Sequence, residues 1–166
     1  AQQGGRLGFK PALAILIPVM DALRAVHEVG LLHRDISPDN IFLTHDRQVK
    51  LIDFGAALAA LGAYSRSLSV TLKPGYAPME QYGSQGRQGR LWTDVYAVGA
   101  TLYQMLTRQM PLEAPDQLYQ DTLKPPTAHG ADLPKAADWR CSRRWRCGGS
   151  SGFNRLWRIK NRNKAF

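Results

Sequence analysis

The stretch from His33 to Asn40 reads HRDISPDN and sets a carboxylate and an amide five residues apart around a proline. A single Asp in a loop is usually a turn former or a solvated charge. Asp35 and Asn40 together are different, because a turn containing Pro and Asp can direct two oxygen-bearing side chains to one place. The stretch therefore suggests two oxygen ligands for a common partner.

A second stretch, LIDFG, adds Asp53 at the predicted end of a short strand. Alone it could be an ordinary strand end followed by a turn glycine. It comes 18 residues after Asp35, however, across a predicted hairpin that begins at Asn40. Asp35, Asn40 and Asp53 then lie at loop edges on one side of the hairpin. Three such oxygen donors suit Mg²⁺ and a bound phosphate.

The elements that must position these residues follow from residue periodicity. Apolar residues recur at helical spacing from Pro11 to Val29, which predicts a helix that ends before Gly30. Pro18 predicts either a kink in this helix or a late start of its regular part. Two β-rich runs, 40–44 and 49–53, predict a small hairpin.

After the hairpin, residues 54–90 show little periodicity and many small residues. This is long for a connection in a compact domain and favours a functional loop. Residues 92–109 have helical periodicity again, and Thr93 is a plausible N-cap. The expected order is therefore helix, loop, hairpin, long loop and helix.

Composition divides the chain at residue 139. The 166 residues are 44% hydrophobic, and no apolar run is long enough to cross a membrane. Residues 1–138 are neutral, whereas residues 139–166 hold the net charge of +9, both cysteines and no acidic residue. The cysteine-free part fits an intracellular setting without a disulfide framework.

The motifs in this order resemble the protein-kinase signature: HRD with an Asn five residues after the Asp, then DFG, then PGYAPMEQY, which is similar to an APE element. The closest resemblance is to bacterial serine/threonine kinases and covers roughly residues 7–138. It implies a mainly α, kinase-like α+β fold, of which only the C-terminal (large) lobe is present, with the small hairpin carrying the catalytic and metal-binding loops.

The resemblance also implies roles for single residues. Asp35 matches the catalytic-loop Asp that accepts the proton of the substrate hydroxyl, and Asn40 and Asp53 match the residues that hold Mg²⁺ on the phosphates of ATP. Six others match structural or regulatory positions: His33 and Phe54 as a stacked pair, Gly55 in the DFG motif, Arg34 as a partner for an activation-loop phosphate, Glu80 as a partner for a later Arg, and Asp94 as the anchor of the catalytic loop. The candidate phosphate acceptors are Ser65, Ser67, Ser69 and Thr71.

One departure from the family concerns the charge near the transferred phosphate. Serine/threonine kinases usually carry Lys two residues after the catalytic Asp, where this chain has Ser37. They usually carry Thr before the Pro-Gly-Tyr stretch, where this chain has Lys73. The two positions face the same cleft in the family, so we expect Lys73 to supply the charge missing at Ser37. The alternative is a solvated Lys73.

Two further departures lie at the ends. Residues 1–166 contain neither a Gly-rich phosphate loop nor a VAIK-like strand, so we expect residues 1–138 to form a partial kinase domain. Residues 139–166 form a basic tail without a sustained apolar stripe, which we expect to pack poorly. One choice of codons for residues 140–158 reads, in another frame, close to VLKALAVRRLIRFQSAVED, which looks like a large-lobe end. We hypothesise that a frameshift produced the tail.

The function implied is transfer of the ATP γ-phosphate to protein Ser or Thr hydroxyls, with ATP and Mg²⁺ as cofactors. The expected setting is cytoplasmic, including the cytoplasmic part of a membrane-anchored parent. Two alternatives are a pseudokinase-like module and a nucleic-acid binder that uses the basic tail, whose Trp and Arg residues could stack on bases. The complete set of Asp35, Asn40 and Asp53 disfavours the first, and a frameshift explains the tail more simply than the second.

Overall fold

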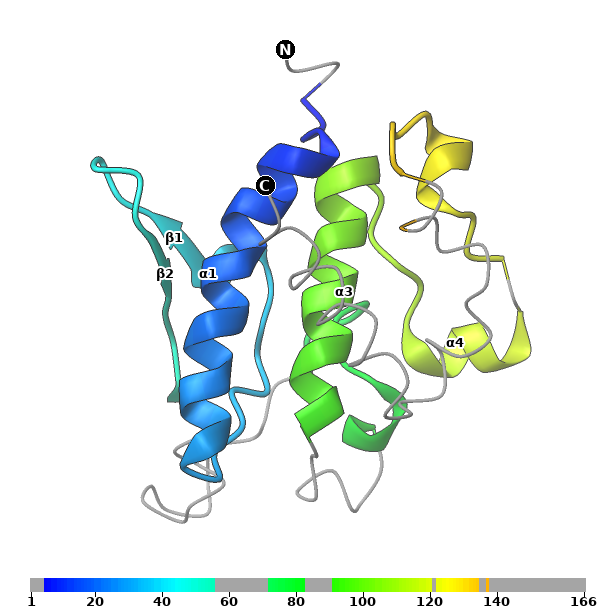
Figure 1. Cartoon of the computed structure of the whole chain (residues 1–166). Helices are drawn as coiled ribbons and strands as arrows, with labels where there is room; N and C mark the ends of the chain where they lie inside the picture. Colours follow the sequence, from blue (N-terminus) through cyan, green and yellow to red (C-terminus); the bar gives the residue numbers. More distant parts are fainter. Residues whose placement is uncertain (1–4, 56–71, 83–90, 121, 135–136, 138–166) are drawn as a thin grey trace.

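The computed structural model describes residues 5–55, 72–82, 91–120, 122–134 and 137. This part of the chain is mostly helical with one two-stranded antiparallel sheet, as expected (Figure 1). In chain order its elements are α1 (Phe9–Glu28), η1 (Pro38–Asn40), β1 (Ile41–Leu43), β2 (Val49–Leu51), η2 (Met79–Gln81), α3 (Leu91–Thr107), α4 (Ala114–Tyr119) and η4 (Pro126–His129), where η marks a 3₁₀ helix.

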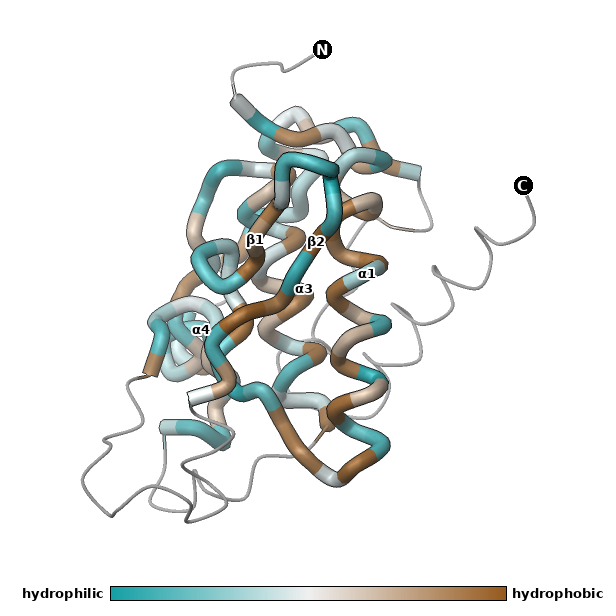
Figure 2. The backbone as a smooth tube through the Cα atoms, turned by 90° about the vertical axis from the view of Figure 1, so that its left-hand side faces the viewer, coloured by the Kyte–Doolittle hydropathy of each residue, from teal (hydrophilic) through white to brown (hydrophobic). Residues whose placement is uncertain are grey.

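The core lies between α1 and α3, which run side by side (Figure 1). Helix α3 is buried on nearly all sides, whereas α1 buries one stripe and exposes the other, so hydrophobic and hydrophilic positions alternate along its tube (Figure 2). Ile36 of the catalytic loop is fully buried in the same cluster. The cluster consists of Ala12, Leu16, Val19, Leu23, Ile36, Ala97, Val98, Leu102 and Leu106.

Helix α1 is longer at its start than its sequence predicts, since it begins at Phe9 rather than Pro11. Pro18 lies inside the helix, which continues on both sides of it, so the predicted late start is wrong. At the other end, Gly30 has φ of +76° and donates to the carbonyl of His27, and Leu31 donates to the carbonyl of Val26. These two hydrogen bonds form a Schellman motif. The helix therefore ends before Gly30, as its sequence predicts.

The hairpin of β1 and β2 pairs Ile41 with Leu51, Phe42 with Lys50 and Leu43 with Val49. Its inward residues Ile41, Val49 and Leu51 pack against the core of α1 and α3. Asn40 directly precedes β1, and Asp53 follows β2 by two residues. The hairpin therefore brings the ends of the two candidate loops to the same edge.

The predicted N-cap of α3 is wrong. Helix α3 begins at Leu91, so Thr93 lies inside its first turn, where its hydroxyl donates to Glu80 Oε1 at 3.0 Å. The predicted long loop is described at residues 54–55 and 72–82, and the latter contain η2. The phosphate-acceptor candidates Ser65 to Thr71 and the expectations for residues 139–166 lie outside the described residues.

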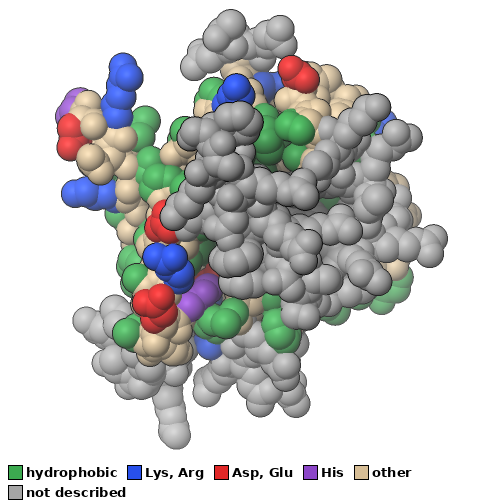
Figure 3. Space-filling view, viewed as in Figure 1, with side chains coloured by type: hydrophobic (Ala, Val, Ile, Leu, Met, Phe, Trp, Pro, Cys, Tyr) green, Lys and Arg blue, Asp and Glu red, His purple; other side chains and the backbone are tan. Residues whose placement is uncertain are grey.

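The surface of the described part mixes charges of both signs. On the face in Figure 3, cationic and anionic side chains are interspersed along the hairpin and the adjoining side of α1. Among the described residues, no helix combines the length and apolarity that a membrane crossing requires.

Candidate active site

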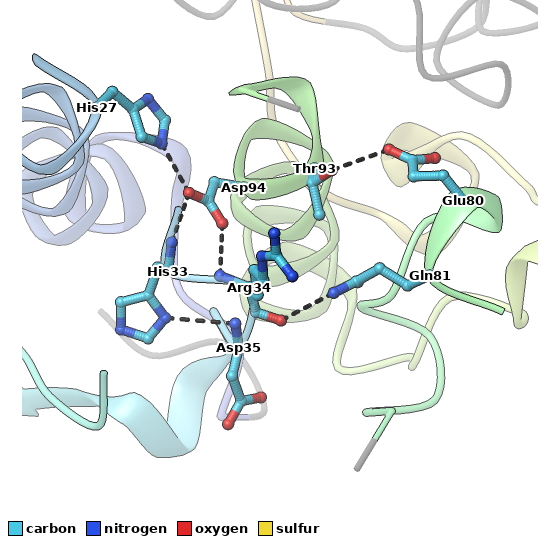
Figure 4. A network of polar contacts seen from close by, with 8 residues as sticks. All are labelled: His27, His33, Arg34, Asp35, Glu80, Gln81, Thr93 and Asp94. Carbon is cyan, nitrogen blue, oxygen red and sulfur yellow. Dashed lines mark hydrogen bonds and ion pairs between the residues drawn. The ribbon is translucent and has the colours of Figure 1, made fainter. Parts of the chain in front are cut away.

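The side chain of Asp94 binds backbone N–H groups at the start of the catalytic loop. Its side chain is fully buried near the start of α3. Oδ1 accepts the backbone N–H of Arg34 at 2.8 Å, and Oδ2 accepts the backbone N–H of His33 at 2.9 Å. Oδ2 also lies 2.7 Å from His27 Nε2, at the end of α1 (Figure 4). One carboxylate therefore joins α1, α3 and the loop that carries Asp35.

His33 is fully buried directly before Arg34 and Asp35. Its Nε2 donates to the carbonyl of Ile52 at 3.1 Å, while its Nδ1 accepts the N–H of Asp35 at 3.3 Å. The Asp35 N–H can only donate, which assigns the proton of the neutral ring to Nε2. Burial lowers the pKa of His33 from 6.5, although Asp94, the Ile52 carbonyl and two nearby carboxylates act in the opposite direction. A neutral His33 thus links the catalytic loop to the end of β2.

Asp35 and Asn40 are in direct contact. The Nδ2 of Asn40 donates to the backbone carbonyl of Asp35 at 2.6 Å and to its carboxylate Oδ2 at 2.9 Å. Because both partners are acceptors, the amide nitrogen of Asn40 must face them. The 3₁₀ turn Pro38–Asn40 creates this approach, since it folds the chain back within five residues.

Asp53 follows β2 in a left-handed conformation, with φ of +62°, which few non-glycine residues adopt. Its side chain is exposed, and Oδ1 accepts the N–H of Gly55 at 3.1 Å. Between them, the ring of Phe54 lies 4.5 Å from that of His33, centroid to centroid, at an angle of 59°. The two rings are therefore in contact, as expected, but they are tilted rather than stacked. The carbonyl of Asn40 accepts the N–H of Ile52 at 2.9 Å, so Asp53 follows the residue paired with Asn40.

Lys73 reaches the catalytic loop from the far end of the long segment. Its Nζ donates to Ser37 Oγ at 2.7 Å and lies 2.9 Å from Asp39 Oδ2. Ser37 is fully buried, and Asp39 is 77% exposed. The structure thus brings the ammonium group of Lys73 to Ser37, two residues after Asp35.

Asp35 and Lys73 line one small pocket. The other lining residues are Arg34, Ile36, Leu72, Tyr76, Ala77, Gln81 and Ala97. The only other acidic or phenolic group in this lining is Tyr76, whose pKa burial and Asp39 raise to about 12. Tyr76 therefore stays protonated at neutral pH, which leaves Asp35 as the carboxylate available to accept a proton there.

The oxygen donors of this site fit Mg²⁺. Asn40 uses its amide nitrogen on Asp35, so its amide oxygen stays available on the other side of the group. Asp53 is exposed and uses one oxygen on Gly55. Carboxylate and amide oxygens are what Mg²⁺ binds, with water and phosphate oxygens completing its octahedron.

The segment after Lys73 forms hydrogen bonds with helix α3 and with the catalytic loop. Glu80 accepts the hydroxyl of Thr93 at 3.0 Å, and Gln81 Nε2 donates to the carbonyl of Arg34 at 3.2 Å (Figure 4). The roles expected for Glu80 and Arg34, toward a later arginine and an activation-loop phosphate, stay predictions.

Comparison with known sequences decides the family. A model described as the protein kinase domain matches residues 2–140. The chain belongs to the protein kinase family. The kinase resemblance of the HRD, DFG and APE-like motifs is thereby confirmed, and so is the expected fold.

Proteins similar to this kinase chain include bacterial kinases. A probable serine/threonine-protein kinase PknB of Corynebacterium glutamicum is 35% identical over 131 residues, covering 74% of the chain and 20% of the relative. Serine/threonine-protein kinase PknL of Mycobacterium tuberculosis is 36% identical over 129 residues, covering 75% and 30%. A solved structure described as the apo form of PpkA-294 is 37% identical, with a TM-score of 0.57, and the match covers 72% of the chain and 41% of that structure. The chain thus spans about a fifth to a third of the length of these two curated relatives.

Four residues of this kinase site escaped the sequence analysis as site residues. Gln81 contacts the catalytic loop, and His27 contacts its anchor Asp94. Thr93 binds Glu80, and Asp39 pairs with Lys73. His27 stands in the apolar stripe of α1, where a histidine needs a buried hydrogen-bond partner, so its position was a signal. Gln81 and Asp39 gave none, because polar residues in loops are ordinarily solvated.

Proposed function

We propose that this chain is the large-lobe part of a protein kinase that transfers the γ-phosphate of ATP to Ser or Thr hydroxyls of proteins. The observation that carries the proposal is the contact between Asn40 Nδ2 and Asp35 Oδ2, at 2.9 Å, inside a loop anchored by Asp94. It joins the candidate proton acceptor to the candidate metal ligand.

The proposed chemistry is an in-line transfer. The substrate hydroxyl oxygen forms a bond to the γ-phosphorus, the bond to the leaving ADP oxygen breaks, and the hydroxyl proton passes to Asp35. Bound Mg²⁺ neutralises charge on the phosphates, and Asn40 and Asp53 would hold it. The rest of the task is positioning, which the hydrogen bonds of His33 and Asp94 perform on the catalytic loop.

Lys73 is proposed as the cation beside the transferred phosphate. Its contact with Ser37, the residue two positions after Asp35, supports this role. A fixed positive charge there stabilises negative charge that develops during transfer, without reorganisation at that moment.

The choice of Ser or Thr as acceptor rests on relatives. Several curated relatives are described as serine/threonine kinases, whereas the 33% identical MasK of Myxococcus xanthus is described as a tyrosine-protein kinase. The cytoplasmic setting rests on the absence of cysteine from residues 1–138 and on the need for ATP.

The test uses a completed catalytic domain, in which residues 7–138 are joined to the small lobe and the C-terminal helices of a relative such as PknB. Transfer of labelled γ-phosphate to a protein substrate is measured, followed by phosphoamino-acid analysis. We expect phosphoserine or phosphothreonine, lost in Asp35→Asn and kept in the matched control Asp46→Asn in the hairpin turn. Phosphotyrosine alone, or equal transfer in both variants, would refute the proposal.

A further inference from the structure

The peptide group between Arg34 and Asp35 decides where the Asp35 side chain points. Arg34 has φ of +67°, a left-handed conformation that a non-glycine residue adopts only when its surroundings hold it. Asp94 Oδ1 fixes the N–H of Arg34. A rotation of the next peptide plane would still redirect Asp35, because that plane carries its Cα.

Both polar ends of this peptide plane are held by side chains. Its N–H, which belongs to Asp35, donates to His33 Nδ1, and its carbonyl, which belongs to Arg34, accepts from Gln81 Nε2 at 3.2 Å. The carbonyl can only accept, so the amide nitrogen of Gln81 is the end that faces it. A plane fixed at both ends cannot rotate without breaking a hydrogen bond.

Gln81 is itself tied to the helix that anchors the loop. It belongs to η2, and its neighbour Glu80 accepts the hydroxyl of Thr93 on α3. Thr93 directly precedes Asp94, the residue that holds the catalytic loop. Figure 4 shows the resulting triangle of η2, α3 and the loop, in which Gln81 closes the third side.

We propose that Gln81 is a positioning residue for Asp35. It couples the segment that carries Lys73 to the direction of the proton-accepting carboxylate, so that the lysine and the carboxylate are aligned together. Five residues separate Lys73 from η2, and Lys73 and Gln81 both line the pocket of Asp35. The proposal deepens the kinase function proposed above and rests on it for its catalytic consequence.

Hydrogen exchange tests the structural part on the full chain, without any need for activity. Gln81→Met keeps the length of the side chain and removes the donor, and Gln109→Met is the matched control at an exposed glutamine. Mass spectrometry of peptides that cover residues 31–37 should show exchange faster by about 3- to 10-fold in Gln81→Met, the factor implied by one lost hydrogen bond. Peptides of α1 and α3 should be unchanged, and Gln81→Leu should behave in the same way.

The completed catalytic domain tests the functional part. Gln81→Met should lower kcat by about 10- to 100-fold, as expected for a misplaced catalytic group, and should leave the KM for ATP nearly unchanged. Unchanged exchange at residues 31–37, exchange that rises over the whole chain, or an unaltered kcat in an active domain would each overturn the proposal. An inactive completed domain with locally faster exchange would instead refute the kinase function and keep the positioning.

Discussion

The Nζ of Lys73 donates a hydrogen bond to the Oγ of Ser37 over 2.7 Å. The two residues exchange the places that a lysine and a hydroxyl residue usually occupy in serine/threonine kinases. The contact joins these two positions, and we expect the charge at the site to come from the segment before the APE-like element rather than from the catalytic loop. Correct placement of that segment then becomes a condition for the charge at the site.

The interchange of lysine and hydroxyl residue between positions 37 and 73 predicts the result of a double substitution. In the completed catalytic domain, Lys73→Thr should reduce kcat by about 100- to 1,000-fold, the usual effect of removing one group that stabilises the transition state. Ser37→Lys combined with Lys73→Thr should recover most of the loss, because it restores the common arrangement. Steady-state kinetics measure both, with Lys50→Thr on the exposed strand as control. A double variant no better than Lys73→Thr would contradict the assignment.

Asp94→Asn should destabilise the chain strongly. The buried carboxylate accepts from His33, Arg34 and His27, and an amide would turn one acceptor into a donor that faces N–H groups. We expect a loss of about 2–4 kcal/mol in the free energy of unfolding, since buried polar groups are left unpaired. Denaturant unfolding measures it against Asp132→Asn, an exposed aspartate. Equal stability of the two variants would show that Asp94 is not an anchor.

His33 predicts a pH dependence of stability. Its folded-state pKa is lowered from 6.5, chiefly by burial, so the unfolded chain binds the proton more tightly. The contribution of the neutral ring is thus fully present above pH 6.5 and is lost as the pH falls through the window below it. Thermal unfolding between pH 7.5 and pH 5 should show a smaller loss in His33→Gln than in the unmodified chain. His45→Gln, at an exposed histidine, should keep the original slope; an equal slope in both variants would contradict the burial argument.

The helices and the hairpin were predictable because their residues follow simple periods. The stripe of α1 and the buried positions of α3 record the 3.6-residue repeat, and Gly30 marks the end of α1 by its left-handed conformation. Motif order also placed Asp35 and Asn40 together, and the ring contact of His33 with Phe54 followed from it.

What escaped prediction depends on contacts between distant segments. Thr93 has the residue type of an N-cap, yet its hydroxyl donates a hydrogen bond to Glu80, thirteen residues earlier. Gln81 donates a hydrogen bond to the carbonyl of Arg34, 47 residues away in the sequence. No local sequence pattern predicts this pair. Sequence periodicity reports which face of an element is buried, whereas such polar pairs are set by how the elements come together.

The basic tail predicts a fault in the reading frame. Residues 139–166 carry nine basic and no acidic residues. One choice of codons for residues 140–158 also reads, in another frame, like the end of a kinase large lobe. Sequencing the coding DNA across the codon of Trp139 should reveal an insertion or deletion there, compared with related genes. An intact single frame would refute the frameshift. Salt-dependent DNA binding, compared with and without residues 139–166, tests the alternative of a nucleic-acid binder.

The polypeptide of residues 1–166 should show no measurable kinase activity and only weak binding of ATP. We expect Asp35, Asn40 and Asp53, together with Mg²⁺, to hold phosphate from one side only. The family's lysine and Gly-rich backbone, which grip the phosphates from the other side, have no counterpart in this sequence. Two carboxylates beside a triphosphate also favour the magnesium complex and disfavour bare ATP.

The measurement is phosphate transfer from labelled ATP to a generic protein substrate, with the completed catalytic domain as the positive control. Isothermal titration with ATP, with and without Mg²⁺, gives the binding part, and binding should depend on the metal. Exposed Phe42, Leu43 and Ile52 should also make the polypeptide associate, since they leave apolar surface on and beside the hairpin. Robust transfer by residues 1–166 that Asp53→Ala abolishes would show that one side of the site suffices.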